Sequence, residues 1–347
     1  MTHAADASGR PLRIAVIGAG AWGTALANAA ARAQPDASAA PGAPSVPLWG
    51  RNAADMATMA TRHENARFLP GVILADGVAP SSDPGVMDDA DAVLLVIPAQ
   101  QIRAALAGLR PHLSRPGLPV IICAKGIERG SGLFMSDVVR QALPEAVPGV
   151  LSGPSFAADV ARGLPTAVVL AADDERLAAR LARRLSGPTL RVYHSGDMRG
   201  VEIGGAAKNV LAIACGIVMG RGLGESARAA LVARGFAEMV RFATAFGGET
   251  ATLMGLSGLG DLVLTCGSAQ SRNFAFGQAL GAGVDLAAAS GGKLTEGAAT
   301  APVLLQRARA AGVDMPVASA VADILDGRLS IDDAVDALMM RPLRREG

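Results

Sequence analysis

Aromatic side chains, cysteine and net charge are all scarce in this sequence of 347 residues. Aromatic residues make up 3% of the chain, and 32 basic residues are balanced by 31 acidic ones. Because there is no basic surplus, we expect no nucleic acid partner. The three cysteines, Cys123, Cys215 and Cys266, lie far apart without CxxC spacing. This sparse, odd-numbered set is typical of a reduced cytoplasmic protein rather than of a disulfide framework.

Long apolar segments are also missing. The longest uncharged stretch near the middle of the chain, residues 209–220, is shorter than the roughly 20 residues that a membrane-spanning helix needs. Residues 1–10, MTHAADASGR, lack the apolar core of a signal peptide, and we interpret them as a frayed tail. We therefore expect a protein without a membrane span.

Hydrophobic residues, in contrast, make up 50% of the chain, enough for a large core and two domains. Up to about residue 200, short apolar runs such as DAVLLVIP and LPVIICAKG alternate with helical patterns. Continuously apolar runs are typical of parallel strands that are covered on both faces. We predict an α/β fold: a doubly wound, Rossmann-like parallel sheet in a dinucleotide-binding domain over residues 1–200. Alanine-rich, helix-period segments predict an all-helical substrate and catalytic domain over residues 201–347.

The segment RIAVIGAGAWGTALANAAARA predicts a strand, a glycine-rich turn and a helix. Gly18, Gly20 and Gly23 match the dinucleotide fingerprint in its required place. The first glycine allows the tight turn, the second lets the backbone approach a pyrophosphate, and the third allows close helix–strand packing. The alternative is an ordinary glycine-rich turn.

The second predicted strand ends in LWGRN, with Arg51 where NAD-binding proteins usually carry an acidic residue for the ribose hydroxyls. A guanidinium suits a 2′-phosphate, so the sequence favours NADP(H) over NAD(H), which stays possible. The alternative is an exposed arginine on a loop.

In EIGGAAKNVLAIACG, Gly204 and Gly205 interrupt a helical pattern, where each costs about 1 kcal/mol relative to alanine. Close approach of a ligand or of another backbone is the usual reason. Lys208 lies one turn further on the same face, in an otherwise apolar segment, and buried lysines are rare unless they are paired or functional. Alternatively, Lys208 extends to solvent at a helix edge.

Two further segments carry candidate binding groups. Lys125 in CAKG follows a buried strand, and ligands bind at the carboxyl ends of strands in such sheets. In GLGDLVLTCGSAQSRN, Asp261 follows a glycine-rich turn, and Ser271, Arg272 and Asn273 precede a predicted helix. Backbone N–H groups at a helix start and a guanidinium make a phosphate site. Alternatively, Ser271 and Asn273 are plain helix caps.

Taken together, these segments closely resemble the bacterial NAD(P)-dependent glycerol-3-phosphate dehydrogenase family, in order, over about residues 12–340. The motifs that carry the resemblance are GAGAWGTALA, CAKG, SGPSFA, AAKNVLAI, GLGDLVLTC, QSRN and EG at 296–297. Beside the fingerprint glycines, the resemblance implies dinucleotide contacts for Ala21, Trp22, Arg51, Lys125, Ala157, Arg272, Leu294 and Glu296. It implies substrate contacts for Lys125, Gly153, Ser155, Lys208, Asp261, Ser271, Arg272 and Asn273.

The resemblance further implies reversible reduction of dihydroxyacetone phosphate to sn-glycerol 3-phosphate for glycerophospholipid synthesis, in a cytoplasmic homodimer without a metal. Lys208 would be the catalytic proton acceptor, with Lys125 as a second cation and Asp261 as an orienting group. Three departures from the family are Ala21 in place of a frequent serine, a longer loop near residues 34–46, and EGAAT in place of EGYxT. Two alternatives stay open: another two-domain dehydrogenase of the opine or 6-phosphogluconate type, and a non-catalytic dinucleotide sensor.

Overall fold

The structure is a computed structural model that describes residues 12–33, 46–291 and 295–342. The predicted tail over residues 1–10 lies outside the described residues, and so does the predicted long loop near residues 34–46 except for Val46, which begins the second strand. The chain forms two compact units, one of Met1–Lys125 and Leu133–Glu202, the other of Gly126–Gly132 and Ile203–Gly347. The predicted domain boundary after residue 200 thus falls close to the change of unit after Glu202, while residues 126–132 group with the second unit.

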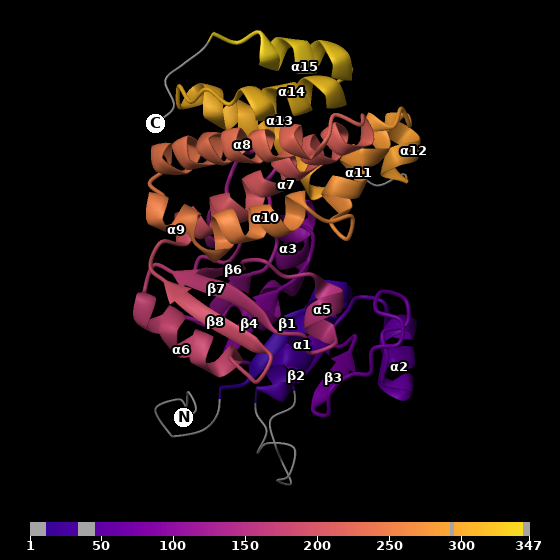
Figure 1. Ribbon diagram of the computed structural model, residues 1–347. Coiled ribbons are helices and arrows are strands. Elements are labelled where there is room, and N and C mark those ends of the chain that lie inside the picture. Colours follow the sequence, from indigo (N-terminus) through magenta and orange to yellow (C-terminus); the bar gives the residue numbers. More distant parts are fainter. Residues whose placement is uncertain (1–11, 34–45, 292–294, 343–347) are drawn as a thin grey trace. The chain divides into compact units, whose positions relative to one another are not determined.

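The first unit is built on one eight-stranded sheet in the order β3-β2-β1-β4-β5-β6-β7-β8 (Figure 1). The chain runs from β1 outward to β2 and β3, and then continues on the other side of β1 with β4, which makes the carboxyl end of β1 a topological switch point. The strands are β1 (Ile14–Ile17), β2 (Val46–Trp49), β3 (Val78–Ser81), β4 (Ala92–Leu95), β5 (Pro119–Ile122), β6 (Val147–Ser152), β7 (Thr166–Ala172) and β8 (Leu190–Ser195).

Both faces of this sheet are buried, which explains the continuously apolar strands. On β1, Ile14 and Val16 join one hydrophobic cluster, whereas Ala15 and Ile17 join the cluster on the other face. The helices of this unit are α1 (Ala21–Arg32), α2 (Ala53–Arg62), α3 (Ile102–Leu113), α4 (Met135–Ala142), α5 (Ala157–Ala161) and α6 (Glu175–Leu185), with 3₁₀ turns η1 (Pro84–Met87) and η2 (Ala99–Gln101). The predicted Rossmann-like fold class is confirmed.

Two strands, β7 and β8, differ from the prediction of an entirely parallel sheet. β7 runs antiparallel to β6, while β7 and β8 are parallel to each other. The connection between β6 and β7 contains only the five-residue helix α5, and it returns the chain directly beside β6. The apolar pattern of TAVVLAA cannot reveal this reversal, because a strand that is buried on both faces reads alike in either direction.

The second unit is helical, as predicted for this part of the chain. Its longest helix, α7 (Met198–Gly220), begins in the first unit and continues into the second. The others are α8 (Glu225–Ala245), α9 (Thr250–Met254), the π-helical turn η3 (Leu256–Gly260), α10 (Asp261–Cys266), α11 (Arg272–Gly281), α12 (Leu286–Ser290), α13 (Glu296–Ala310), α14 (Pro316–Leu325) and α15 (Ile331–Met339) (Figure 1).

Among the described helices, α7 alone is long and apolar enough to cross a membrane, but 89% of its most apolar window is buried inside the structure. Such burial is what the core helix of a folded unit shows. α7 packs against α11 backbone to backbone: a Cβ on Gly216 would overlap the carbonyl oxygen of Phe274, and a Cβ on Gly277 would overlap that of Ile213. Glycine at these positions therefore sets the distance between the two helices.

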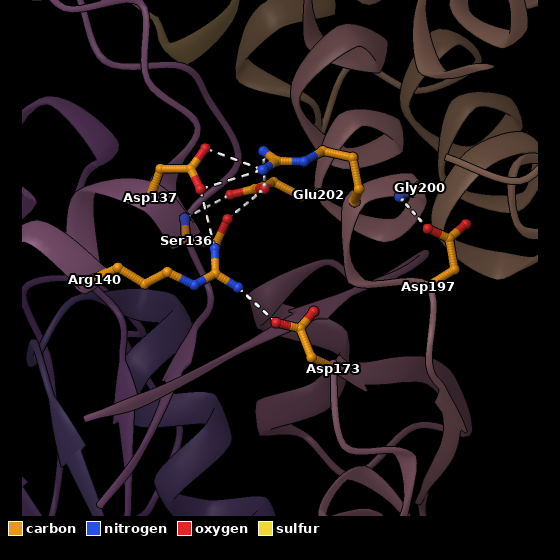
Figure 2. Close-up of polar contacts among 8 residues, drawn as sticks. Ser136, Asp137, Arg140, Asp173, Asp197, Gly200 and Glu202 are labelled. Atoms are coloured by element: carbon orange, nitrogen blue, oxygen red, sulfur yellow. Dashed lines mark hydrogen bonds and ion pairs between the residues drawn. The ribbon is translucent and has the colours of Figure 1, made fainter. Parts of the chain in front are cut away.

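The first turns of α7 are tied to α4 within the first unit by a buried polar cluster (Figure 2). The backbone N–H and the hydroxyl of Ser136 both donate to the carboxylate of Glu202, at 2.8 and 2.9 Å. Arg199 donates to Glu202 at 3.1 Å and to Asp137 at 3.0 Å. Burial raises the pKa of Glu202, and the charge of Arg199 and the two Ser136 hydrogen bonds oppose that rise.

Glu238 of α8 is a second buried carboxyl group, and it caps α14. Its oxygens accept hydrogen bonds from the backbone N–H groups of Val317 at 2.7 Å and Ala318 at 3.2 Å. Burial raises its pKa to about 7, although these two N–H donors and Arg241 pull the pKa down. Glu238 therefore holds a proton in the folded protein at a pH where the unfolded chain has already released it.

This difference predicts a pH-dependent stability. The folded state binds more protons than the unfolded state between pH 4.5 and about 7, so the contribution of Glu238 to stability falls as the pH rises through that window. Between pH 5 and pH 8, we expect the unfolding free energy of the Glu238→Gln variant to fall by about 1–3 kcal/mol less than that of the unchanged protein. Urea unfolding of both proteins at the two pH values measures it, and parallel pH profiles would contradict the assignment.

Candidate functional site

The glycine-rich turn after β1 has the three properties that a dinucleotide needs. Gly18 has a φ of 112°, and a Cβ there would overlap the carbonyl oxygen of Val96. A Cβ on Gly20 would meet nothing within 4 Å, whereas a Cβ on Gly23 would overlap the carbonyl oxygen of Gly18. The turn is thus tight at Gly18, open at Gly20 and closely packed at Gly23.

The start of α1 is suited to a phosphate group. Its N-cap is Gly20, no side chain caps it, and its first turn carries no acidic residue. The backbone N–H groups at this helix start are therefore free to bind an anion, and the helix dipole favours negative charge there. Ala21 and Trp22 lie at the margin of the adjoining core cluster together with Ala157, which begins α5. Since α5 packs against α1, these three predicted residues lie on neighbouring helices, and the set fits a bound dinucleotide.

Lys125 lies just beyond β5, at the carboxyl edge of the sheet. Its Nζ donates to the carbonyl oxygen of Gly153 at 3.1 Å, and the hydroxyl of Ser155 donates to the same oxygen at 3.0 Å. Gly153 has a φ of 137°, and a Cβ there would lie 2.9 Å from the Cα of Val168. The structure therefore brings together three residues that the sequence analysis assigned to the substrate.

Arg51 lies two residues beyond β2 and is exposed. Its side chain makes no hydrogen bond or ion pair with another described residue. This position fits both interpretations that the sequence left open, a ligand for a 2′-phosphate and an exposed arginine on a loop.

In the second unit, Lys208 and Asp261 form a buried ion pair. Lys208 Nζ lies 2.9 Å from Oδ1 of Asp261 and 2.7 Å from the hydroxyl of Thr265, which itself donates to Asp261 at 3.2 Å. Only 6% of Lys208 and 1% of Asp261 is exposed. The interpretation of Lys208 as a side chain that extends to solvent at a helix edge is therefore wrong.

Thr265 is a member of this group that the sequence analysis missed. It lies four residues after Asp261 on α10, a spacing that places two side chains on the same face of a helix. The sequence could have indicated Thr265 only through this spacing. An i, i+4 pair points to a shared partner only once α7 is known to pack against that face of α10.

Gly204 explains how Lys208 and Asp261 come so close. A Cβ on Gly204 would lie 2.6 Å from the carbonyl oxygen of Ser257, in the π-helical turn that leads into α10. Of the two causes considered for a glycine at this position, the structure shows the approach of another backbone. This contact sets α7 against the start of α10, one turn before Lys208.

The start of α11 carries three predicted residues with different surroundings. Ser271 is the N-cap, and its hydroxyl accepts a hydrogen bond from the N–H of Phe274 at 3.2 Å, so the capping alternative holds for this residue. Arg272 is exposed and has no side-chain partner among the described residues. Asn273 is buried; it donates to Oδ1 of Asn209 at 3.0 Å and accepts from the N–H of Gly297 at 2.9 Å. Asn273 thus links α7, α11 and α13.

Two further predicted residues lie near the start of α13. Glu296 is its first residue, following Thr295, the N-cap. Leu294 lies outside the described residues. Within the described part of the chain, no three His, Cys, Asp or Glu side chains are grouped so that they could hold a metal ion.

The first unit has a Rossmann-like sheet with an open glycine turn, and the second has a buried lysine–aspartate pair. Together these features define a class of protein, the NAD(P)-dependent dehydrogenases. Two family models match this chain: the N-terminal part of NAD-dependent glycerol-3-phosphate dehydrogenase over residues 13–178, and its C-terminal part over residues 197–336. The chain belongs to the NAD-dependent glycerol-3-phosphate dehydrogenase family, which confirms the resemblance found in the sequence.

Individual relatives agree with this assignment. The chain is 60% identical over 334 residues to glycerol-3-phosphate dehydrogenase [NAD(P)+] of Methylobacterium radiotolerans, covering 96% of this chain and 98% of that protein. It is 59% identical over 334 residues to glycerol-3-phosphate dehydrogenase [NAD(P)+] of Azorhizobium caulinodans, again covering 96% of this chain and 98% of that protein. The crystal structure of glycerol-3-phosphate dehydrogenase from Coxiella burnetii superposes with a TM-score of 0.87 at 37% identity, covering 95% of this chain and 99% of that one.

The Gly204 contact generates a prediction about the second unit. Gly204→Ala places a methyl group 2.6 Å from the backbone carbonyl oxygen of Ser257, so one of the two backbones must shift. We expect a loss of about 1–3 kcal/mol of unfolding free energy and a fall in activity as α7 and α10 separate. Gly108→Ala is the matched control, because Gly108 also lies in a helix but a Cβ there meets nothing within 4 Å. That change is expected to stabilise by about 0.5–1 kcal/mol. Urea unfolding measures both, and equal effects would contradict the backbone contact.

Proposed function

We propose that this protein catalyses the reversible NAD(P)H-dependent reduction of dihydroxyacetone phosphate to sn-glycerol 3-phosphate, with Lys208 as the acid–base group. The observation that carries the proposal is the buried Lys208–Asp261 pair in a chain of this family. Membership of the family over both parts of the chain weighs against an opine or 6-phosphogluconate type. A non-catalytic dinucleotide sensor would have no need of a buried, hydrogen-bonded lysine in its helical unit.

The chemistry requires one hydride and one proton. The nicotinamide supplies the hydride when the cofactor is bound. As the carbonyl oxygen of the substrate gains negative charge, protonated Lys208 donates a proton to it, and in the reverse direction neutral Lys208 accepts the proton of the hydroxyl group. Asp261 and Thr265 hold the Lys208 amine in a fixed position, which removes the freedom of a four-carbon side chain before the reaction.

Other residues bind the reactants. The start of α1 would hold the pyrophosphate, with Ala21, Trp22, Ala157, Leu294 and Glu296 as further contacts of the dinucleotide. We assign Lys125, with Gly153 and Ser155, to the substrate, where its charge would polarise the carbonyl oxygen. Arg272 and the start of α11 would bind the phosphate group, since an exposed guanidinium without an internal partner suits an anion. Asn273 would act mainly by bracing α11 against α7.

We further propose that NADP(H) is preferred to NAD(H), that the enzyme acts in the cytoplasm as a homodimer, and that its product enters glycerophospholipid synthesis. Arg51 supports the cofactor preference, because it is exposed two residues beyond β2, where NAD-binding proteins usually carry an acidic residue for the ribose hydroxyls. The remaining points rest on the family.

The first experiment tests Lys208. We expect Lys208→Ala to lower kcat for dihydroxyacetone phosphate by about 10²–10⁴-fold, measured as NADPH oxidation, while NADPH still binds. Removing one partner of a buried pair leaves a buried charge, which can itself destabilise the fold. The double variant Lys208→Met with Asp261→Asn removes both charges and keeps the test valid. Activity near that of the unchanged enzyme in either folded variant would contradict the role of Lys208.

The second experiment tests Arg51. We expect kcat/KM with NADPH to be at least as high as with NADH, and Arg51→Ala to reduce only the NADPH value, by about tenfold to a hundredfold for the loss of a charged hydrogen bond. Arg62→Ala on α2 is the control, because it removes an exposed arginine of the same unit. A preference for NADH that Arg51→Ala leaves unchanged would contradict the assignment.

A further inference from the structure

Three arginines on helix α6 face a groove that the reaction does not use. Arg176, Arg180 and Arg183 line one side of a hollow of about 470 Å³ in the first unit. Their spacing of four and three residues places them on one side of the helix, about 6 and 4.5 Å apart along its axis. The opposite side of α6 is buried against the core through residues such as Ala178 and Leu181, so the arginines are held on a packed helix.

The charge of these arginines is not neutralised within the described chain. None of the three side chains has a hydrogen bond or ion pair to another described residue, and all three are exposed. Two nearby acids are engaged elsewhere: Asp173 pairs with Arg140 and Glu175 with His194. Asp174 lines the groove, where its Oδ1 accepts a hydrogen bond from the backbone N–H of Arg176 and caps the helix. Glu145 is a further exposed acid, and its carbonyl oxygen accepts a hydrogen bond from the N–H of Gly117 on the other wall of the groove.

Several other arginines of the same unit have partners within the unit. Arg140 binds Asp137 and Asp173, and Arg162 binds Asp159. Arg184, beside Arg183, is buried and donates to backbone carbonyl oxygens. Arg51, Arg62 and Arg110 of this unit are also exposed, but each lies apart, whereas Arg176, Arg180 and Arg183 lie together on one side of α6.

The groove lies at the amino ends of the parallel strands, opposite to the ends that carry the glycine turn. Its other side is formed by Gly117, just before β5, and by Val147, the first residue of β6. These are the amino ends of parallel strands, whereas the glycine turn and Lys125 lie at carboxyl ends. The antiparallel β7 ends at this amino edge, beside β6, and thereby starts α6 there. The reversal of β7 is thus the reason why the groove exists.

The shape and charge of the groove indicate its ligand. A volume of about 470 Å³ falls within the range of about 300–1,000 Å³ that small-molecule sites occupy. Guanidinium groups bind phosphate oxygens in a bidentate manner, and three of them spread over about 10 Å of helix exceed the reach of one phosphate. Leu177 and Val147 add apolar surface for an organic group. A hollow of this size favours a small molecule over a flat protein surface.

We infer that the groove between α6 and the starts of β5 and β6 binds an organic polyphosphate, an anion with two or three linked phosphates and a partly apolar body. Arg180 and Arg183 bind the phosphates together with Arg176, and Leu177 and Val147 contact the organic part. This binding does not depend on the dehydrogenase reaction, because none of these residues belongs to the glycine turn or to the Lys208 group.

The test uses the full-length protein with NADPH at a saturating concentration, so that the dinucleotide site is occupied. Calorimetric titration with metal-free ATP is expected to show one binding site per chain. AMP and inorganic tripolyphosphate are expected to bind at least tenfold more weakly, because one lacks the linked phosphates and the other the organic part. No binding of ATP would overturn the inference, and so would equal affinity for either of the two other compounds.

A matched pair of variants locates the site. Arg180→Gln with Arg183→Gln is expected to weaken ATP binding by about tenfold to a hundredfold or more, as charged hydrogen bonds are lost. Arg110→Gln with Arg309→Gln removes the same charge from exposed arginines elsewhere and is expected to leave the affinity unchanged. Both variants should keep the kcat of the unchanged enzyme, which shows that they fold. Equal weakening in the two variants would mean a general effect of charge and would overturn the inference.

Discussion

The second unit depends on how closely the backbone of α7 can approach its neighbours. Glycines remove the side chains at the contact points: Gly204 faces the carbonyl of Ser257, and Gly216 faces that of Phe274. From the other side, Gly297 of α13 meets the carbonyl of Asn209 on α7. Each contact brings another helix start next to α7. The cost of glycine inside a helix, about 1 kcal/mol at each position, is offset by the packing that it permits.

The charged centre of this unit follows from that packing. A buried ammonium is tolerated only when a carboxylate and further hydrogen bonds compensate its lost hydration. With α10 held against α7, Asp261 and Thr265 meet Lys208 within hydrogen-bonding distance. With α11 held against α7, Asn273 can join α7 to α13, and Arg272 begins its helix beside that brace. The arrangement of the helices is therefore what fixes the position of the Lys208 amine.

Much of the first unit could be predicted from its sequence. Every predicted strand is present, and the glycine turn has the tight, open and packed positions that its three glycines indicated. The direction of β7 could not be predicted, because an apolar strand covered on both faces carries no mark of its direction. The α6 groove depends on that direction, since it places Arg176, Arg180 and Arg183 beside the starts of β5 and β6. The same three arginines read from sequence alone are an ordinary solvated helix face.

The sequence by itself determined the fold class, the family and the identity of Lys208 and Asp261 as groups of interest, because local patterns of glycine, charge and hydrophobicity are written in consecutive residues. Only the tertiary structure decided that Thr265 joins these two and that Asn273 braces three helices. Those roles depend on side chains as far as 64 residues apart in the chain. Such pairs meet only when packing places their helices together, and no local pattern reports the distance between them.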